Sequence, residues 1–312
     1  MPSRGIGGRA RRRRARRRRD WAEGLPLDAL LAILHRLGHV GVLMAADRVC
    51  RSWRRAARDE PSLWRRITMR CDQWMAAKLN RRGVACAAVR RSAGQCEAFC
   101  GEYVGNDGFL VYLSEQAPCL KSLRLISCYG VTDEGVTVAV KEFPLLEELE
   151  VSLCDNVVAG LYKDAGDVCP QLKIFRLNKA RFDETEWRRS KDNVALATAN
   201  MHGLRSLQLF ANSLTNKGLE AILDNCPHLE SLDIRHCFNV NMNEALRAKC
   251  GRIKTLRLSD DTTNDYEYNA QMQSFLFWSW EIHAMMSSRR RSLNSYYNGN
   301  HGYDCSFPRL SR

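Results

Sequence analysis

Cysteine and histidine are the residues of this chain whose side chains could do chemistry, and the sequence contains 13 Cys and 7 His. A thiolate beside an imidazole is a nucleophile, and two CxxC pairs together bind zinc. No CxxC pair occurs, and Cys96 and Cys100 have no matching second half. His236 and Cys237 are the nearest Cys/His pair, but neighbours on a strand point to opposite faces. The pattern therefore favours a structural role for Cys237.

Other catalytic signatures are missing from the sequence as well. It has no GxSxG nucleophile motif, no HExxH zinc motif and no glycine-rich phosphate loop. It also lacks the apolar N-terminal stretch of a signal peptide and any run close to about 18 apolar residues. We therefore expect a non-catalytic protein without a metal or cofactor. Its cysteines should stay reduced inside the cell, mostly as small buried hydrophobic residues.

The net charge of +13 is concentrated in one run of arginines. Ten arginines and no acid lie within the first 19 residues, which leaves three net charges for the rest of the chain. Like charges at this density, with no apolar face, predict a disordered tail. The tail is either a solvated appendage or a nuclear-import or nucleic-acid-binding patch. No aromatic residue interrupts the run to stack on bases, which argues against sequence-specific nucleic-acid recognition.

An internal repeat dominates the sequence between residues 93 and 261. Six segments carry apolar residues at positions 1, 4 and 6, and four of them have Cys or Asn at position 9. A degenerate first copy starts at Ala93. This is the leucine-rich-repeat pattern, in which parallel strands and outer helices stack into a curved solenoid around one core. The clear copies start at Leu120, Leu146, Leu172, Leu204, Leu229 and Ile253.

Positions 3, 5 and 7 of each copy should point toward the concave side, because side chains alternate along a strand. Position 5 is polar and often charged, which predicts an exposed charge ladder worth about 0–1 kcal/mol per pair. Position 7 holds large side chains that packing does not explain, and such residues are frequent at binding hot spots. The predicted substrate-binding residues are Ile126, Phe210 and Arg235.

A short helical module lies between the arginine run and the repeats. Pro26 suits the first turn of a helix, apolar residues then recur at helical spacing from Leu30 to Leu37, and Gly38 should end the helix. Two further apolar stretches follow, "VGVLMAADRVCRSWRRAA" and "PSLWRRI". Three short helices bury too little surface to be robust alone, so we expect the module to share apolar surface with a neighbour or partner.

"LPLDALLAILHRL", followed by "VCRSWRRAA" and "PSLWRRI", resembles an F-box of the plant F-box/leucine-rich-repeat proteins. The resemblance implies docking onto the SKP-type adaptor of a cullin–RING ubiquitin ligase. One departure is "GHVGVLMAAD", where many F-boxes carry an Asp-Leu pair. By this resemblance, the adaptor-binding residues are Leu25, Pro26, Leu27, Leu30, Leu31 and Leu34, and the F-box core residues are Ile33, Leu37, Val49, Cys50, Trp53 and Trp64.

The expected fold class is α/β, with a three-helix F-box ahead of a leucine-rich-repeat solenoid of about seven copies. The predicted segments are a basic tail at residues 1–19, the F-box at 20–67, a helical linker at 68–92, repeats at 93–261, a cap over the last repeat at 262–286 and a disordered tail at 287–312.

The leading functional hypothesis is a substrate receptor of an SCF-type ubiquitin ligase, located in the nucleus, the cytoplasm or both. The F-box would bind the adaptor, and the repeats would bind the protein to be ubiquitinated. The alternatives are a repeat scaffold with a vestigial F-box and a nucleic-acid-associated protein that uses the basic tail. A shallow arc of about seven repeats disfavours an enclosed small-molecule pocket.

Overall fold

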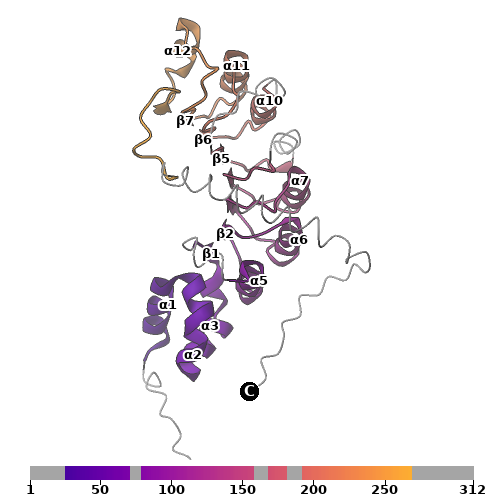
Figure 1. Ribbon diagram of the computed structural model, residues 1–312, viewed down its shortest axis with the longest axis vertical. Helices are drawn as coiled ribbons and strands as arrows, with labels where there is room; N and C mark the ends of the chain where they lie inside the picture. Colours follow the sequence, from indigo (N-terminus) through magenta and orange to yellow (C-terminus); the bar gives the residue numbers. More distant parts are fainter. Residues whose placement is uncertain (1–24, 71–78, 158–167, 181–191, 269–312) are drawn as a thin grey trace, which may run out of the picture.

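The computed structural model describes residues 25–70, 79–157, 168–180 and 192–268. A helical module lies at one end, and a column of strands with helices along one side continues from it (Figure 1). The module consists of α1 (Leu27–Gly41), a π-helical turn at Val42–Ala46, α2 (Asp47–Val49), α3 (Arg51–Asp59) and a 3₁₀ turn at Pro61–Trp64.

The strands form one eight-stranded sheet in chain order, and every neighbouring pair is parallel. This confirms the predicted α/β architecture. The strands are β1 (Arg66–Met69), β2 (Ala98–Glu102), β3 (Ser122–Ile126), β4 (Glu148–Ser152), β5 (Ile174–Asn178), β6 (Ser206–Gln208), β7 (Ser231–Asp233) and β8 (Thr255–Arg257). The helices beside them are α5 (Arg81–Arg91), α6 (Asp107–Gln116), α7 (Asp133–Lys141), α10 (Asn193–Ala199), α11 (Asn216–Asn225) and α12 (Glu244–Cys250).

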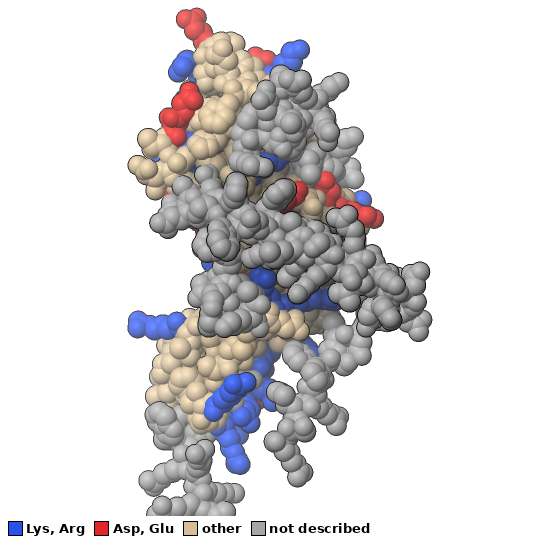
Figure 2. All heavy atoms as spheres, viewed as in Figure 1, with Lys and Arg blue, Asp and Glu red and all other residues tan. Residues whose placement is uncertain are grey.

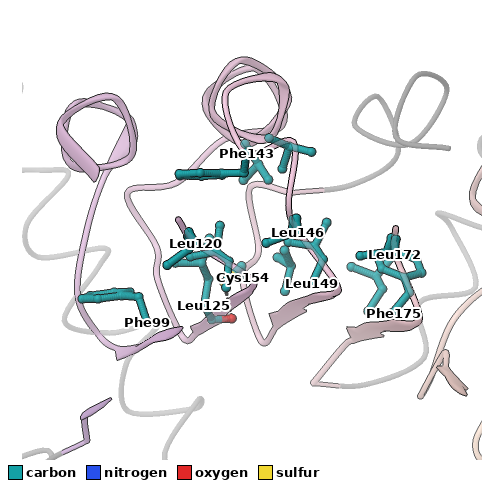
Figure 3. Packing of buried hydrophobic residues seen from close by; sticks show 14 of the residues in the cluster. Phe99, Leu120, Leu125, Phe143, Leu146, Leu149, Cys154, Leu172 and Phe175 are labelled. Carbon is teal, nitrogen blue, oxygen red and sulfur yellow. Dashed lines mark hydrogen bonds between the residues drawn. The ribbon is translucent and has the colours of Figure 1, made fainter. Parts of the chain in front are cut away.

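The repeat residues at positions 1, 4 and 6 form the core, as their spacing predicts. Leu120, Leu146 and Leu172 lie in a row on the helix side of the strands, and Leu149 and Phe175, at position 4, lie beneath Leu146 and Leu172 (Figure 3). Each of these leucines is at most 1% exposed. Burial of one such side chain stabilises the fold by about 1.5–3 kcal/mol, so the stacked rows dominate the folding free energy.

The sheet begins earlier than the repeat pattern indicates. β1 lies within residues expected to belong to the F-box and the linker, and it pairs with β2 along its whole length. The first copy also starts at Cys96 rather than Ala93, because Phe99 pairs with Leu123 and is fully buried. The pattern at Ala93 fails because the stretch lacks leucines and offers two weak registers.

The bend after each strand uses one repeated backbone conformation. The residue at position 8 has a positive φ in five copies, although none of the five is glycine. Position 9 then turns back beneath the strand, where Cys128 Sγ donates to the Val104 carbonyl at 2.7 Å and Asn212 Nδ2 donates to the Leu177 carbonyl at 2.7 Å. Cys and Asn can both occupy this position because each donates a hydrogen bond to a backbone carbonyl there. The five left-handed residues are Tyr103, Ser127, Leu153, Ala211 and His236.

The outer helices are joined to one another by shared caps. Thr132 caps α7 by accepting from the Gly135 amide, while its own amide and hydroxyl donate to Asp107 on α6 at 2.9 and 2.8 Å. Asp192 and Thr215 repeat this arrangement between α10 and α11. These caps satisfy helix N-terminal amides and fix the spacing of neighbouring repeats.

One apolar stretch of the module meets the length and composition of a membrane-spanning helix, contrary to the expectation from the sequence. It runs over Leu27–Ala46. The backbone leaves helical geometry at Gly38, where φ is 68°, and Leu30, Leu34 and Val42 belong to the main core. A core helix of a globular domain and an N-terminal signal sequence pass the same test, so length and composition alone do not assign a membrane span.

Candidate functional site

The helical module carries several large apolar side chains that are exposed. Of the eleven large hydrophobic side chains that the described residues leave exposed, six lie in this module. Such a concentration of exposed apolar side chains in one part of the molecule marks a surface for a partner. We call it the module face; it consists of Leu25, Leu27, Ile33, Leu37, Met44 and Val49.

The structure changes the roles of several predicted F-box residues. Leu30 and Leu34, expected to contact the adaptor, are 3% and 0% exposed, because they lie one helical turn apart on the inner side of α1. Ile33, Leu37 and Val49 were assigned to the core but are 39%, 46% and 44% exposed. Apolar spacing alone does not distinguish two adjacent stripes on one helix, which is why the inner and outer rows were exchanged.

The other predicted F-box residues range from exposed to fully buried. Leu25, Pro26 and Leu27 are exposed, and Leu31 is partly buried against the core. Trp64 is fully buried, and its indole Nε1 donates to the Ala57 carbonyl at 3.0 Å. The last two predicted core residues, Cys50 and Trp53, are only partly buried.

The module and the sheet share one core. His39 bridges them, since one ring nitrogen lies 3.0 Å from the Leu63 carbonyl and the other accepts from the Thr68 amide on β1. Arg91 of α5 stacks over the Trp64 ring at 5.2 Å and donates to the Ala57 carbonyl. These contacts join the module to β1 and α5, so the module packs directly against the start of the sheet.

The concave side of the sheet carries a row of polar side chains at position 5. The strand register places Arg124, Glu150 and Arg176 directly beside one another. Glu150 accepts from Arg124 at 2.6 Å and from Arg176 at 3.1 Å, and farther along Gln208 donates to Asp233 at 2.8 Å. The predicted ladder is present, but its centre is more buried than expected, because Glu150 is 0% exposed.

Glu150 is the electrostatic centre of this row. Burial alone would raise the pKa of its carboxyl, but the Arg124 guanidinium and hydrogen bonds from Arg124, Tyr268 and Ser152 hold that pKa below its ordinary value. The carboxylate is therefore charged in the folded protein and accepts hydrogen bonds from four side chains. A buried carboxylate is stable only when it is paired in this way.

The chain returns across the concave face after β8. This return segment, residues 262–268, is seen in Figure 1 as the orange stretch on the side of the strands opposite the helices. It crosses the strands in reverse order, since Asp265 contacts residues next to β7 and on β8, whereas Tyr268 contacts β4. The described part of the predicted cap therefore covers the concave face, and residues 269–286 lie outside the described residues.

Two carboxylates of the return segment each join two arginines. Asp265 accepts from Arg235 at 2.5 Å and from Arg257 at 3.1 Å. Glu267 accepts from Arg70 at 2.5 Å and from Arg124 at 3.0 Å. Hydrogen bonding to Arg235 lowers the pKa of Asp265, which keeps its carboxylate charged. The return segment thus supplies the carboxylates of these ion pairs, and the arginines come from other parts of the chain.

Two tyrosines of the return segment fill the space between these ion pairs. Tyr266 stacks on Phe210 with ring centroids 3.9 Å apart and an interplanar angle of 11°. Tyr268 packs edge-on against Tyr266 and donates its hydroxyl hydrogen bond to Glu150. Both tyrosines are less than 8% exposed. They belong to a second apolar cluster on the concave side, with Cys100, Ile126, Leu153, Phe210 and Ala211.

The three residues predicted to contact substrate lie on the concave side but are covered. Ile126, Phe210 and Arg235 are 0%, 2% and 3% exposed, because the return segment lies over them. Ile126 and Phe210 belong to the same apolar cluster as the two tyrosines of that segment. The direction of position 7 is as expected from strand alternation, whereas its accessibility is not. The sequence signal for this contact was the acidic–aromatic alternation "DYEY" at residues 265–268, which the repeat pattern does not explain.

Nine of the eleven cysteines in the described residues are buried, Cys50 is partly buried and Cys119 is exposed. Cys237 Sγ donates to the Leu209 carbonyl at 2.8 Å, and burial raises the pKa of its thiol to about 12, so it carries no thiolate near neutral pH. Cys96 and Cys100 belong to different apolar clusters on the two sides of β2. Within the described ranges, no group of three His, Cys, Asp or Glu side chains is placed to hold a metal.

Charged side chains are distributed unevenly along the molecule. In the view of Figure 2, Lys and Arg side chains stand out on the helical module at the lower end, and the visible acidic side chains lie mainly over the repeats. α3 carries exposed arginines, among them Arg51, Arg55 and Arg58. The module therefore presents apolar and basic surface together.

Comparison with known proteins matches both parts of the chain. An F-box-like family matches residues 22–70, and a leucine-rich-repeat family matches residues 200–223 and 225–237. The chain is 43% identical over 250 residues to the putative F-box/LRR-repeat protein 23 of Arabidopsis thaliana, covering 78% of this chain and 54% of that protein. It therefore spans about half the length of that relative.

A second relative matches over most of both chains. The F-box protein SKIP19 of Arabidopsis thaliana is 41% identical over 251 residues, which cover 80% of each protein. Among solved structures, the chain resembles one in the crystal structure of the Rad7 and Elc1 complex in yeast, with a TM-score of 0.43 and 18% identity. That similarity covers 55% of this chain and 44% of the yeast chain.

Proposed function

The chain belongs to the plant F-box/leucine-rich-repeat family, and from this premise we propose that it is a non-catalytic substrate receptor of an SCF-type ubiquitin ligase. Proteins of the F-box/leucine-rich-repeat family typically act as such receptors. The module would bind an SKP-type adaptor and, through it, the cullin–RING ligase, while the repeats would bind the protein to be ubiquitinated.

The module face is the observation that supports adaptor binding. Its six apolar side chains are between 37% and 46% exposed, although the core of the same helices is complete. Covering them with a partner would remove apolar surface from water, which favours association before the entropic cost of binding is subtracted. We assign the adaptor contact to Leu25, Pro26 and Leu27, and add Ile33, Leu37 and Val49 to it on the basis of their exposure.

The packed junction between module and sheet supports the receptor role. A substrate on the concave face would be held at a constant distance from the adaptor, because His39 and Arg91 join the two parts. Holding two reactants in a fixed arrangement raises their effective concentration, and the reaction itself would be carried out by other subunits. This chain then contributes position rather than catalytic groups.

Co-expression with an SKP-type adaptor tests the proposal. Wild-type protein should co-elute with the adaptor in gel filtration, and Leu27→Glu/Ile33→Glu should not, because charges on the module face would have to be buried. The matched control, Val138→Glu/Leu196→Glu, puts the same charges on exposed positions of α7 and α10 and should retain the adaptor. Equal co-elution of both variants would refute the assignment.

We also propose that the protein acts in the nucleus, the cytoplasm or both. The support is the arginine run at residues 1–19, which has the composition of a nuclear-import signal. A fluorescent fusion should lose nuclear enrichment when the arginines at positions 11–14 and 16–19 are replaced by glutamine. Unchanged distribution would show that the run has no role in localisation.

A further inference from the structure

The return segment resembles a bound peptide rather than a part of the sheet. Its backbone makes a hydrogen bond within itself, from the Tyr266 amide to the Thr263 carbonyl, and receives one from Arg235 at the Thr262 carbonyl. Its ion pairs, ring stacking and tyrosine hydrogen bond with the concave face are made by side chains. The concave face therefore contacts residues 265–268 mainly through the side chains of the sequence "DYEY".

We propose that the concave face is a binding site for a short acidic–aromatic segment of a partner protein, and that residues 265–268 occupy this site in the free receptor. The proposal rests on the proposed function, in which the concave face holds the protein to be ubiquitinated. It names the chemistry of the segment that is recognised: an acid, an aromatic residue, a second acid and a tyrosine, in that order.

The arginines make the site specific for acidic residues. Arg70 and Arg257 donate to carboxylates of the return segment, on Glu267 and Asp265 respectively. Their side chains are 41% and 45% exposed, and the two carboxylates are 44% and 51% exposed. Ion pairs this open to water are individually weak and exchange readily. They select an acidic segment without making it permanent.

The aromatic positions differ from each other in a way that defines the motif. The Tyr266 hydroxyl is buried and has no hydrogen-bond partner among the described residues. Phenylalanine would therefore fit this position at least as well as tyrosine. The Tyr268 hydroxyl instead donates to Glu150, whose carboxylate lies at the centre of the polar row. A site that hydrogen-bonds a hydroxyl rejects the residue that lacks it, so the last position requires tyrosine.

The site also extends beyond the return segment. The His236 ring is tilted against Phe210 with ring centroids 4.7 Å apart, and it stacks on Phe238 with centroids 5.3 Å apart. Phe238 is 56% exposed. A partner segment longer than residues 265–268 can add contacts at this exposed ring. Such additional contacts give a partner a way to displace a segment that is tethered in place.

Peptide binding in trans tests the proposal. The probe is a fluorescein-labelled peptide with the sequence of residues 262–268, and the receptor is the full chain carrying Asp265→Lys/Glu267→Lys, which repels its own segment from the four arginines. We expect this variant to bind the peptide at least about ten-fold more tightly than wild type, because the tethered competitor is removed. A peptide with Asn and Gln at the two acidic positions should bind at least about ten-fold more weakly than the parent peptide.

Further variants separate the effect of charge from the effect of each aromatic ring. Glu115→Lys/Glu134→Lys makes the same charge change on exposed positions of α6 and α7 and should bind the peptide as wild type does. Replacing the first peptide tyrosine by phenylalanine should leave affinity equal or higher, and replacing the second should lower it at least about five-fold. Equal binding to wild type and to Asp265→Lys/Glu267→Lys, or equal binding of the uncharged peptide, overturns the proposal.

Hydrogen exchange of the wild-type protein keeps the proposal falsifiable if the double variant does not fold. Residues 262–268 should exchange at least about a hundred-fold faster than β3, β4 and β5, because a displaceable segment opens without unfolding the sheet. Exchange as slow as that of the three strands would show a permanent part of the fold and overturn the proposal.

Adaptor retention, measured on the same preparations, separates the two hypotheses. Both double variants leave the module face unchanged and should retain the adaptor. If the adaptor is retained but the peptide does not bind, only the acidic–aromatic site is refuted. If the peptide binds but the adaptor is not retained, only the receptor assignment is refuted.

Discussion

The ring of Tyr266 lies flat against the ring of Phe210, with centroids 3.9 Å apart, and covers a side chain that the repeat sequence alone places on an open concave surface. Aromatic pairs contribute about 0.5–1.5 kcal/mol beyond the apolar area that they bury. The contact joins a repeat to a segment far along the chain and is the main apolar attachment of the return segment.

Substitution of Tyr266 should distinguish its ring from its hydroxyl. We expect Tyr266→Ala to lower the free energy of unfolding by about 3 kcal/mol, because a buried ring and its stacking are lost. Tyr266→Phe should leave it unchanged or slightly higher, since the buried hydroxyl has no partner among the described residues. Urea unfolding of the three proteins measures both differences. A loss as large in the Phe variant as in the Ala variant would contradict the described environment.

Stability should depend on the charge of Glu150. The pKa of this carboxyl is lowered in the folded state, mainly by Arg124 acting against the effect of burial. The stabilisation is therefore complete above the ordinary value of 4.5 and is lost as pH falls through the lower folded value. We expect Glu150→Gln to cost about 2–3 kcal/mol at pH 7. The gap between wild type and variant should narrow in urea titrations below pH 4.5, and a gap that widens there would be contrary evidence.

The shared helix caps predict a specific glycine requirement. A Cβ added at Gly135 would clash with the carboxylate of Asp107, which accepts hydrogen bonds from Thr132. We expect Gly135→Ala to lower stability by about 1–3 kcal/mol, because the cap must move. Gly41→Ala is the control, since its Cβ meets only Leu37 at 3.6 Å and alanine favours the helix. Thermal unfolding should show a lower midpoint for the first variant only, and equal midpoints would argue against this cap.

Two leucines of α1 should separate folding from partner binding. Leu34→Ala removes a fully buried side chain and should cost about 2–5 kcal/mol. Leu27→Ala trims a side chain that is 46% exposed and should change stability by less than about 1 kcal/mol, while weakening adaptor binding. Thermal melts and adaptor pull-down on both variants give the comparison. The assignment of inner and outer rows fails if Leu27→Ala is the more destabilising change.

The parts of the fold that repeat were predictable from the sequence, because each copy supplies the same signal again. Leu120, Leu146 and Leu172 set the register, and their rows are buried between strands and helices as the spacing predicts. The stretch around β1 was not predictable, because it lacks the leucines of a repeat and follows the F-box directly. β1 is an edge strand that pairs only with β2, so it forms with little sequence signal of its own.

The sequence predicts which way the side chains of the candidate site point, but not that they are covered. Strand alternation correctly places Ile126, Phe210 and Arg235 on the concave side, but local patterns cannot show that residues 262–268 fold back over them. This is a long-range contact between a repeat and a non-repetitive segment. The exchange of Leu34 and Ile33 has a similar cause, since only packing against α3 and β1 decides which stripe of α1 faces inward.

Calorimetric titration of an SKP-type adaptor into the full-length protein tests the central claim most directly. Wild type should bind, Leu25→Ala/Pro26→Ala should bind at least about ten-fold more weakly, and the control Val111→Ala/Val138→Ala, on exposed positions of α6 and α7, should bind as wild type does. Absence of binding by wild type, or equal affinity of the Leu25→Ala/Pro26→Ala variant, would contradict the assignment of this chain as a receptor that joins a ligase through its module face.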